Sequence, residues 1–421
     1  DHYHRYWDDI RLMRRLNLGA YRFSIAWSRI IPDGTGPVNH AGIGFYDRLV
    51  DALLEAGIEP FVTLYHWDLP AALQTSGGWA ARDTAHAFAR YAETVARALG
   101  DRVRLWSTHN EPWVASFVGH LFGEHAPGIT DLSTALQAAH HILLSHGLAV
   151  PAIRAHAQSG AQVGIVHNLE WVEPAPCGPG AAGGGAAGDL VPDGAGPGHF
   201  KDCDVAAARR HDGAFNRWFL DPVFRGEYPS EMVEFYGENG PEVVAGDLEA
   251  ISVPIDYLGI NYYTRRIIAD DQSESGGFLK ARKVSFPFVP HAAFEQWEVA
   301  PEGLYRLLLR VANEYGSPPI FVTENGTPLD DTLSGDRVHD PARIDYMARH
   351  IAAVWMAIDA GVDVRGYFVW SLMDNLEWNL GRTKRFGLVY TDFESQQRVI
   401  KDSGRWYATA AETNRLVMTI T

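Results

Sequence analysis

Short hydrophobic runs recur along the chain, and a longer amphipathic segment follows each of them. The runs are almost continuous in β-branched, aromatic and aliphatic residues, which is typical of strands buried on both faces of a parallel sheet. Seven runs of this kind lie at residues 20–26, 60–65, 103–108, 163–168, 257–262, 319–323 and 366–370. Their alternation with helical segments predicts an α/β fold with right-handed crossovers.

The segments between the runs have a helical period. Residues 40–56 place their apolar side chains on one stripe and end before Gly57, a favourable residue just after a helix. Residues 83–99 follow the same pattern. Two further helices are predicted at the ends of the chain, over residues 1–17 and 403–416.

The number of strands points to a barrel. A closed (β/α)8 barrel, or TIM barrel, needs eight strands, and seven are visible. Because the helix at residues 1–17 leads into the first visible run, a strand would be expected before it. We therefore predict a TIM barrel that begins one strand late, folded as a single domain over residues 1–421. Its first and last visible strands would have unpaired edges, which a homo-oligomer or another polypeptide could cover.

One segment does not fit the alternating pattern. Residues 174–198 are rich in Gly, Ala and Pro and cannot bury enough apolar surface to order themselves. A flexible loop insertion is predicted here rather than a domain linker, because the strand pattern resumes afterwards in the same style. Cys177 and Cys203 flank the segment, and two free thiols are expected rather than one disulfide.

Composition and charge exclude several classes of partner. The formal net charge of −16 argues against nucleic acid and anionic membranes, which need clustered Lys and Arg. No run approaches the roughly 20 apolar residues of a membrane span. We also expect no signal peptide, and therefore a cytoplasmic protein. The sequence has no HExxH, Cys/His cluster or GxxxxGK[ST] motif, so neither a metal nor another cofactor is predicted.

Two glutamates stand where predicted strands end. Glu111 follows the third run in Thr108-His109-Asn110-Glu111-Pro112, and Glu324 follows the sixth in Thr323-Glu324-Asn325-Gly326. The carboxyl ends of barrel strands meet at one rim, where active sites lie. There, one carboxylate can act as a nucleophile while the other stays protonated as a general acid. Taken singly, each glutamate could instead start a helix or form a turn.

The remaining strand ends carry polar and aromatic residues where packing alone would favour Val, Ile and Leu. The second run ends in Tyr65-His66-Trp67-Asp68, the fifth in Asn261-Tyr262-Tyr263-Thr264, and the seventh leads from Trp370 to Glu377 and Trp378. Hydroxyl-rich ligands need such donors, acceptors and aromatic faces. The abundance of aromatic residues, with 13 Trp, 17 Tyr and 19 Phe, agrees with a site for sugar rings.

Eight motifs in a fixed order carry a family resemblance: DHYHRYWDDI, YRFSIAWSRI, YHWDLP, THNEPW, GINYYTR, VTENG, VRGYFVWSLMDNLEW and KRFGLVY. With them the chain resembles the β-glucosidases of glycoside hydrolase family one, from Asp1 to the C-terminal KDSGRWY. The resemblance implies a retaining β-glycosidase that hydrolyses the terminal sugar from small β-glycosides without a cofactor. It makes Glu111 the acid/base and Glu324 the nucleophile.

The resemblance also implies roles for other residues. The nucleophile would be supported by Arg22, Asn261 and Tyr263. The sugar would be bound by His66, Trp67, Asn110, Glu377 and Trp378, with Trp370 as the floor of the site. Because the Glu377 carboxylate would repel a phosphate, a free glycoside is the expected substrate.

An alternative from another class stays open. The family's first strand and its sugar-binding Gln are expected to be absent, which would favour a weakly active or inactive sugar-binding or scaffold barrel. Loss of one buried sugar contact costs about 1–3 kcal/mol in the transition state. The choice among glucose, galactose and fucose, and the nature of the aglycone, also stay open at this point.

Overall fold

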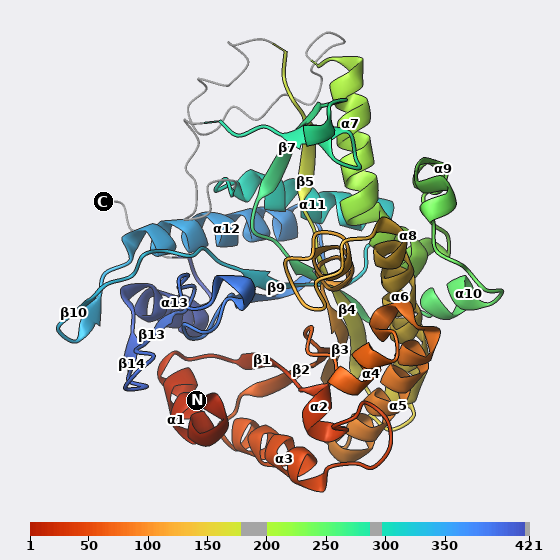
Figure 1. Cartoon of the computed structure of the whole chain (residues 1–421). Coiled ribbons are helices and arrows are strands. Elements are labelled where there is room, and N and C mark those ends of the chain that lie inside the picture. Colours follow the sequence, from red (N-terminus) through yellow and green to blue (C-terminus); the bar gives the residue numbers. More distant parts are fainter. Residues whose placement is uncertain (178–199, 287–296, 417–421) are drawn as a thin grey trace.

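Seven parallel strands form the main sheet of the computed structural model, which describes residues 1–177, 200–286 and 297–416 (Figure 1). The strand order follows the chain, β1-β2-β3-β4-β6-β9-β12, and each strand pairs with the next in parallel. The strands are β1 (Ala20–Ser24), β2 (Glu59–Tyr65), β3 (Leu105–Asn110), β4 (Gln162–Asn168), β6 (Tyr257–Asn261), β9 (Ile320–Asn325) and β12 (Val364–Val369). All seven predicted runs are therefore strands, and the α/β barrel is confirmed.

Helices surround the sheet and carry the crossovers (Figure 1). In α5, for example, Phe88, Tyr91 and Val95 are buried on the inward face while the opposite face is charged. The long helices are α1 (His2–Arg15), α3 (His40–Glu55), α5 (Arg82–Leu99), α6 (Leu132–Arg154), α11 (Pro301–Glu314), α12 (Pro341–Asp359) and α13 (Asp402–Thr413). The shorter helices are α2 (Trp27–Ile30), α4 (Ala71–Thr75), α7 (Asp202–Asp212), α8 (Trp218–Arg225), α9 (Ser230–Tyr236) and α10 (Asp247–Ile251).

Small sheets extend from the barrel loops. The largest has three strands, β5 (Trp171–Pro174), β7 (Arg265–Asp270) and β8 (Ala281–Lys283), which continue the chain beyond β4 and β6. Strand β7 pairs in parallel with β5 and antiparallel with β8. Two hairpin-like pairs are formed by β10 (Leu333–Ser334) with β11 (Arg337–Val338), and by β13 (Val389–Thr391) with β14 (Arg398–Ile400). The hydrophobic pattern predicts none of these strands, because most are too short to show a period.

An aromatic cluster fills the interior of the barrel. The ring of Phe61 on β2 lies 5.5 Å from Tyr257, 5.6 Å from Phe321 and 5.4 Å from Phe368, all edge to face. Aromatic pairs in this geometry are favourable beyond the area they bury. The cluster ties together β2, β6, β9 and β12 beneath the rim where the strands end.

The two outermost strands of the sheet differ from the others. Strands β1 and β12 are mostly half-buried, and no described strand pairs with their outer edges. A cavity of about 840 Å³ is lined by residues of both strands, among them Tyr21, Phe23, Tyr367 and Phe368. Whether a homo-oligomer covers this cavity stays a prediction.

The predicted loop insertion at residues 174–198 lies largely outside the described residues, so it also stays a prediction. Its flanking cysteines, Cys177 and Cys203, are free thiols, as the composition predicts. Among the described helices, none combines the length and the apolar composition that crossing a lipid bilayer would require.

Candidate active site

The carboxyl ends of the strands meet at one rim, and their pairing becomes irregular there. The register shifts between Ser107 and Asn110 on β3 and between Ile260 and Asn261 on β6. Such irregularities change the direction of side chains next to functional sites. Glu111 follows with a positive φ of 48°, and its N–H donates to the carbonyl of Val166 (2.9 Å). Because positive φ is unfavourable for residues other than glycine, the surrounding structure must hold Glu111 in this conformation.

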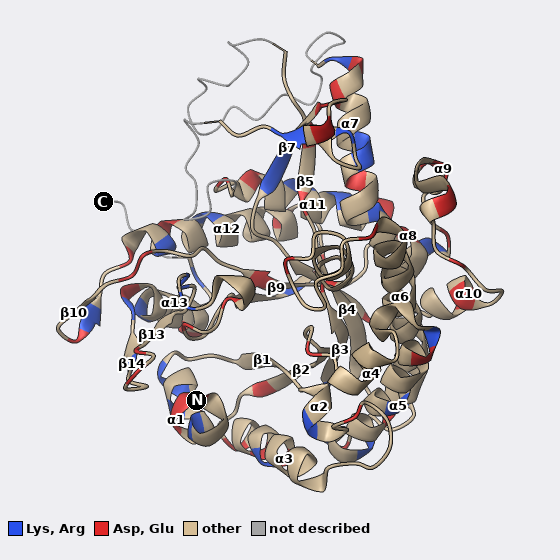
Figure 2. Cartoon of the chain, viewed as in Figure 1, with Lys and Arg blue, Asp and Glu red and all other residues tan. Residues whose placement is uncertain are grey.

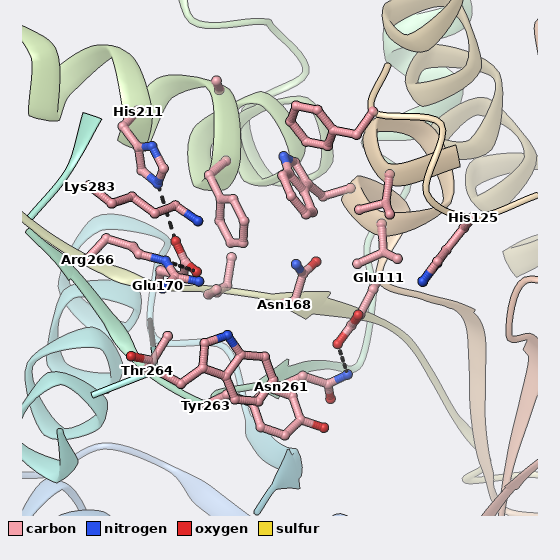
Figure 3. A pocket seen from close by; sticks show the side chains of 18 of the residues that line it. Glu111, His125, Asn168, Glu170, His211, Asn261, Tyr263, Thr264, Arg266 and Lys283 are labelled. Carbon is pink, nitrogen blue, oxygen red and sulfur yellow. Dashed lines mark hydrogen bonds and ion pairs between the residues drawn. The ribbon is translucent and has the colours of Figure 1, made fainter. Parts of the chain in front are cut away.

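One cavity of about 450 Å³ brings most of the predicted site residues together. Figure 3 shows part of its lining, with Glu111, Asn261 and Tyr263 among the labelled residues. Its lining includes Glu111, Glu324, His66, Trp67, Asn261, Tyr263, Trp370, Glu377 and Trp378. Arg22 and Asn110 lie behind this lining and contact it through hydrogen bonds. Residues from five strand ends thus converge, as the rim of a parallel barrel requires.

Glu324 is surrounded by donors. Nη1 of Arg22 donates to its Oε1 (2.7 Å), and the hydroxyl of Tyr263 donates to its Oε2 (2.6 Å). All three side chains are largely buried, so water screens the Arg22 charge weakly. Both contacts stabilise a negative charge on Glu324, which is the state that a nucleophile needs.

Glu111 lies in a different environment within the same cavity. Burial, followed by the negative charge of Glu324, raises the pKa of Glu111 to about 8. The hydrogen bond from Asn261 (2.6 Å to Oε1) and the charge of Arg22 oppose this shift only in part. At neutral pH Glu111 is therefore protonated and can donate a proton.

The side chain of Asn261 contacts Glu111 directly and Glu324 only through other residues. The resemblance implies that Asn261 supports the nucleophile; its amide nitrogen donates to Glu111 and to Oδ1 of Asn110 (3.0 Å). Its own Oδ1 accepts from the hydroxyl of Thr323 (2.7 Å), which fixes the direction of the amide. The register pairs Asn261 with Glu324 along the backbone, but the strand irregularity directs its side chain toward Glu111.

Asn110 connects the two carboxyl groups. Its Oδ1 accepts from Nη2 of Arg22 (2.7 Å) as well as from Asn261, and its amide donates to Nε2 of His66 (3.2 Å). A continuous set of hydrogen bonds therefore runs from Glu111 through Asn261, Asn110 and Arg22 to Glu324. Such a network fixes the relative positions of the two carboxyl groups.

Aromatic rings and a third carboxyl group line one side of the cavity. The ring of Trp378 lies 4.7 Å from Trp67 and 5.9 Å from His66, and His66 also stacks at 5.8 Å from Trp370. Burial and then the Arg22 charge lower the pKa of His66 to about 3, so its ring is neutral. Burial and then the charge of Glu324 raise the pKa of Glu377 to about 7, against a hydrogen bond from Trp370. This side offers stacking faces, donors and acceptors to a polar ring.

The sequence analysis missed the far part of the cavity. It is lined by residues of α7, β7 and β8, by the segments that follow β3, α7 and β7, and by the end of β4 and the loop after it, among them Trp113, Asn168, Glu170, His211, Phe215, Arg266, Phe278 and Lys283. Asn168 ends a predicted strand and Trp113 closely follows another, so the reasoning used for the other strand ends could have found both. The others lie on elements that the hydrophobic pattern does not predict. Within the described residues, no cluster of His, Cys, Asp and Glu side chains is arranged to hold a metal ion.

Comparisons with known proteins agree with this geometry. The sequence profile of glycosyl hydrolase family 1 matches residues 1–180 and 192–416. Beta-glucosidase A of Thermotoga maritima is 44% identical over 99% of this chain and 87% of its own length. A bifunctional beta-D-glucosidase/beta-D-fucosidase of Bifidobacterium breve is 41% identical over 97% of this chain and 86% of its own length. The solved structure of a family 1 β-glucosidase from Thermotoga maritima has a TM-score of 0.90, with 99% of this chain and 88% of that chain covered.

Proposed function

The chain belongs to glycosyl hydrolase family 1, and we propose that it is a retaining β-glucosidase acting on small β-glycosides. The observation that carries the proposal is the contrast between two carboxyl groups in one cavity. Glu324 is held as a carboxylate by Arg22 and Tyr263, while Glu111 has a raised pKa and keeps its proton. Retaining glycosidases need this division between nucleophile and acid.

In the first step Glu324 attacks the anomeric carbon of the bound sugar. The bond to the aglycone oxygen breaks, and that oxygen takes the proton of Glu111. The sugar is then joined to Glu324 as an ester. Because Arg22 and Tyr263 donate to different oxygens of Glu324, they hold its carboxylate in a fixed orientation for the attack.

In the second step Glu111 acts as a base. Formation of the ester removes the negative charge of Glu324, which is one of the causes that raise the pKa of Glu111. The pKa of Glu111 therefore falls, and its carboxylate takes a proton from the attacking water. The water adds to the anomeric carbon, the ester bond breaks, and Glu324 leaves as a carboxylate with the original configuration restored.

The sugar-binding roles belong to the same proposal. We assign the glycone to the side of the cavity formed by His66, Trp67, Asn110, Trp370, Glu377 and Trp378. The faces of indole rings suit the C–H faces of a pyranose, and a neutral His66, whose Nε2 accepts from Asn110, can donate from Nδ1 to a hydroxyl. The names of the relatives support glucose, and that of the Bifidobacterium breve protein includes fucose.

The alternative of an inactive sugar-binding barrel is less well supported. A scaffold would have no need for a buried carboxyl group with a raised pKa beside a buried carboxylate, because burying such groups costs free energy. A homo-oligomer, a cytoplasmic location and a single domain with a loop insertion stay predictions.

Replacing the proposed nucleophile tests the function. Glu324→Ala is expected to reduce kcat on 4-nitrophenyl β-glucoside by at least ~10⁴-fold, because no covalent intermediate can form. Added azide should restore turnover and yield the α-glucosyl azide, since the small anion fits where the carboxylate stood. The exposed Glu234→Ala serves as the control. Normal rates in Glu324→Ala, or azide rescue that yields a β-product, would contradict the proposal.

A further inference from the structure

The far part of the cavity has one wall made by the paired strands β7 and β8. Alternate residues of a strand point to the same side, and Arg266 and Ile268 on β7 and Ala281 and Lys283 on β8 line the cavity, as does Arg282 between the last two. Ile268 and Lys283 are direct partners across the antiparallel pair, so their side chains share this face. The wall therefore presents both apolar and cationic groups to whatever extends beyond the sugar.

One buried carboxylate, that of Glu170, lies beside the positively charged side chains of this wall. Glu170 is buried, and both of its oxygens are engaged: Oε1 accepts from Nε of Arg266 (2.7 Å) and Oε2 from Nε2 of His211 (3.3 Å). Burial would raise the pKa of Glu170, but Arg266, the His211 hydrogen bond and Lys283 lower it to about 2. One carboxylate thus stands beside two cations, Arg266 and Lys283.

The ammonium group of Lys283 is the second positive charge beside Glu170, after that of Arg266. Among the described residues, no hydrogen bond or ion pair joins its ammonium group, and Figure 3 shows its side chain ending in the cavity near Glu170. Lys283 is exposed to solvent as a whole residue, but its ammonium group lies among the cavity side chains. Partial burial of that group and then Arg266 lower the pKa of Lys283, while Glu170 and the exposed Glu124 raise it. An anion bound here would relieve the repulsion between Lys283 and Arg266. The location is unusual in an acidic chain, and β7 is one of its basic elements (Figure 2).

Between this cation and the carboxyl pair the cavity is lined largely by apolar and aromatic side chains. Trp113 and Phe215 lie 4.4 Å apart, and Phe278, Leu279 and Ile268 belong to the same lining, while Asn168 adds one polar side chain. Figure 3 shows Lys283 and Glu111 on opposite sides of the cavity. The aglycone of a bound glycoside would therefore contact the apolar side chains close to the sugar and the Lys283 ammonium group at its far end.

We propose that Lys283 binds an anionic group, a carboxylate in the simplest case, at the far end of an aromatic aglycone. The substrate class is then the β-glucosides of phenols that carry a side-chain acid. The inference rests on the proposed function, since it names the aglycone of the same reaction. Lys283 acts in substrate selection, and the proton transfer at Glu111 does not require it.

A matched pair of substrates tests this proposal. The β-glucoside of 3-(4-hydroxyphenyl)propanoic acid and the corresponding primary amide have the same ring and the same shape. Two methylene groups separate the variable group from the ring that carries the leaving oxygen. For the wild type, kcat/KM should favour the acid by about fivefold, the upper range for a partly exposed ion pair. Raising the ionic strength from about 0.05 to 0.5 M should reduce this ratio toward one.

Variants of two lysines separate the specific contact from general charge. Lys283→Met should abolish the preference for the acid, and Lys283→Arg should retain it. Lys280→Met is the control, because Lys280 is exposed just before β8 and does not line the cavity. A wild-type ratio of one, or a ratio that survives in Lys283→Met, would overturn the proposal.

A binding measurement keeps this inference apart from the proposed function. Titration calorimetry of Glu324→Gln with the two glucosides gives the ratio of affinities without turnover. A preference for the acid that depends on Lys283 would support the inference even if the wild type hydrolysed neither glucoside. Equal affinities in an otherwise active enzyme would reject the inference and leave the proposed function intact.

Discussion

The inner strands of the barrel and its two end strands have different environments. Strands β6 and β9 are buried at every residue, and β2 and β3 at every residue after the first. In β1 and β12, by contrast, most residues are half-buried, and each strand has one described neighbour in the sheet. The hydrophobic content of the two groups is similar, so burial here depends on which neighbours a strand has.

The proposed chemistry is divided between these two regions. Glu111 and Glu324, with Asn110 and Asn261, lie on or directly after inner strands. Arg22 lies on β1 and Trp370 directly follows β12. The proposed reacting groups are thus held by the well-packed strands, while one charge and one aromatic surface come from the two strands at the ends of the described sheet. This difference suggests which substitutions will affect folding and which will affect catalysis alone.

The largest expected difference between the regions is in stability. Phe61→Ala on β2 should lower the free energy of unfolding by about 3–5 kcal/mol, the usual range for a fully buried Phe. Phe23→Ala on β1 should cost about half as much, because Phe23 is already half-exposed and loses less burial. Equilibrium unfolding in guanidinium, followed by fluorescence and circular dichroism, measures both values. Equal losses would show that the end strands are as well packed as the inner ones.

A smaller effect is expected from the two donors to Glu324. Arg22→Met removes a charge and the hydrogen bond to Asn110, so kcat/KM should fall by about 100-fold. Tyr263→Phe removes one neutral donor, and a loss of about tenfold is expected. Steady-state kinetics on 4-nitrophenyl β-glucoside test the pair, with the exposed Arg14→Met as the control. A larger loss in Tyr263→Phe would mean that the open edge of β1 leaves Arg22 poorly positioned.

The smallest effect concerns the dependence of activity on pH. Because Glu111 must be protonated to act as an acid, kcat/KM should fall about tenfold per pH unit above its pKa of about 8. Asn261 on an inner strand and Arg22 on an end strand both lower this pKa. Asn261→Ala and Arg22→Met should therefore move the alkaline limb to higher pH, the former by more.

The dependence of kcat/KM on pH should be measured for both variants and compared with that of the control Arg14→Met. An alkaline limb that stays in place in both variants would indicate that another group controls it.

The strand-end reasoning succeeded where the signal is local. Glu111, Glu324, His66, Trp67 and Trp370 each follow a continuous hydrophobic run, and parallel strands bring such positions to one rim whatever the loops do. It failed for Glu170, Arg266 and Lys283, because the short strands that carry two of them have no recognisable period. The direction of Asn261 also escaped prediction, since a register irregularity at the end of β6 sets it.

The sequence by itself determined the α/β alternation, the positions of the strands and the two glutamates that follow them. The strand positions follow from hydrophobic periodicity, which is a property of residues close together in the sequence, and the two glutamates are found because they follow those strands. The family resemblance implied that Glu111 is the acid, but only the tertiary structure shows what raises its pKa, namely burial and the charge of Glu324. Only the tertiary structure decided that Asn261 contacts Glu111 and that a cation faces the far end of the cavity. Each of these depends on the distance between groups from separate parts of the chain, and electrostatic interaction and burial are properties of that spatial arrangement.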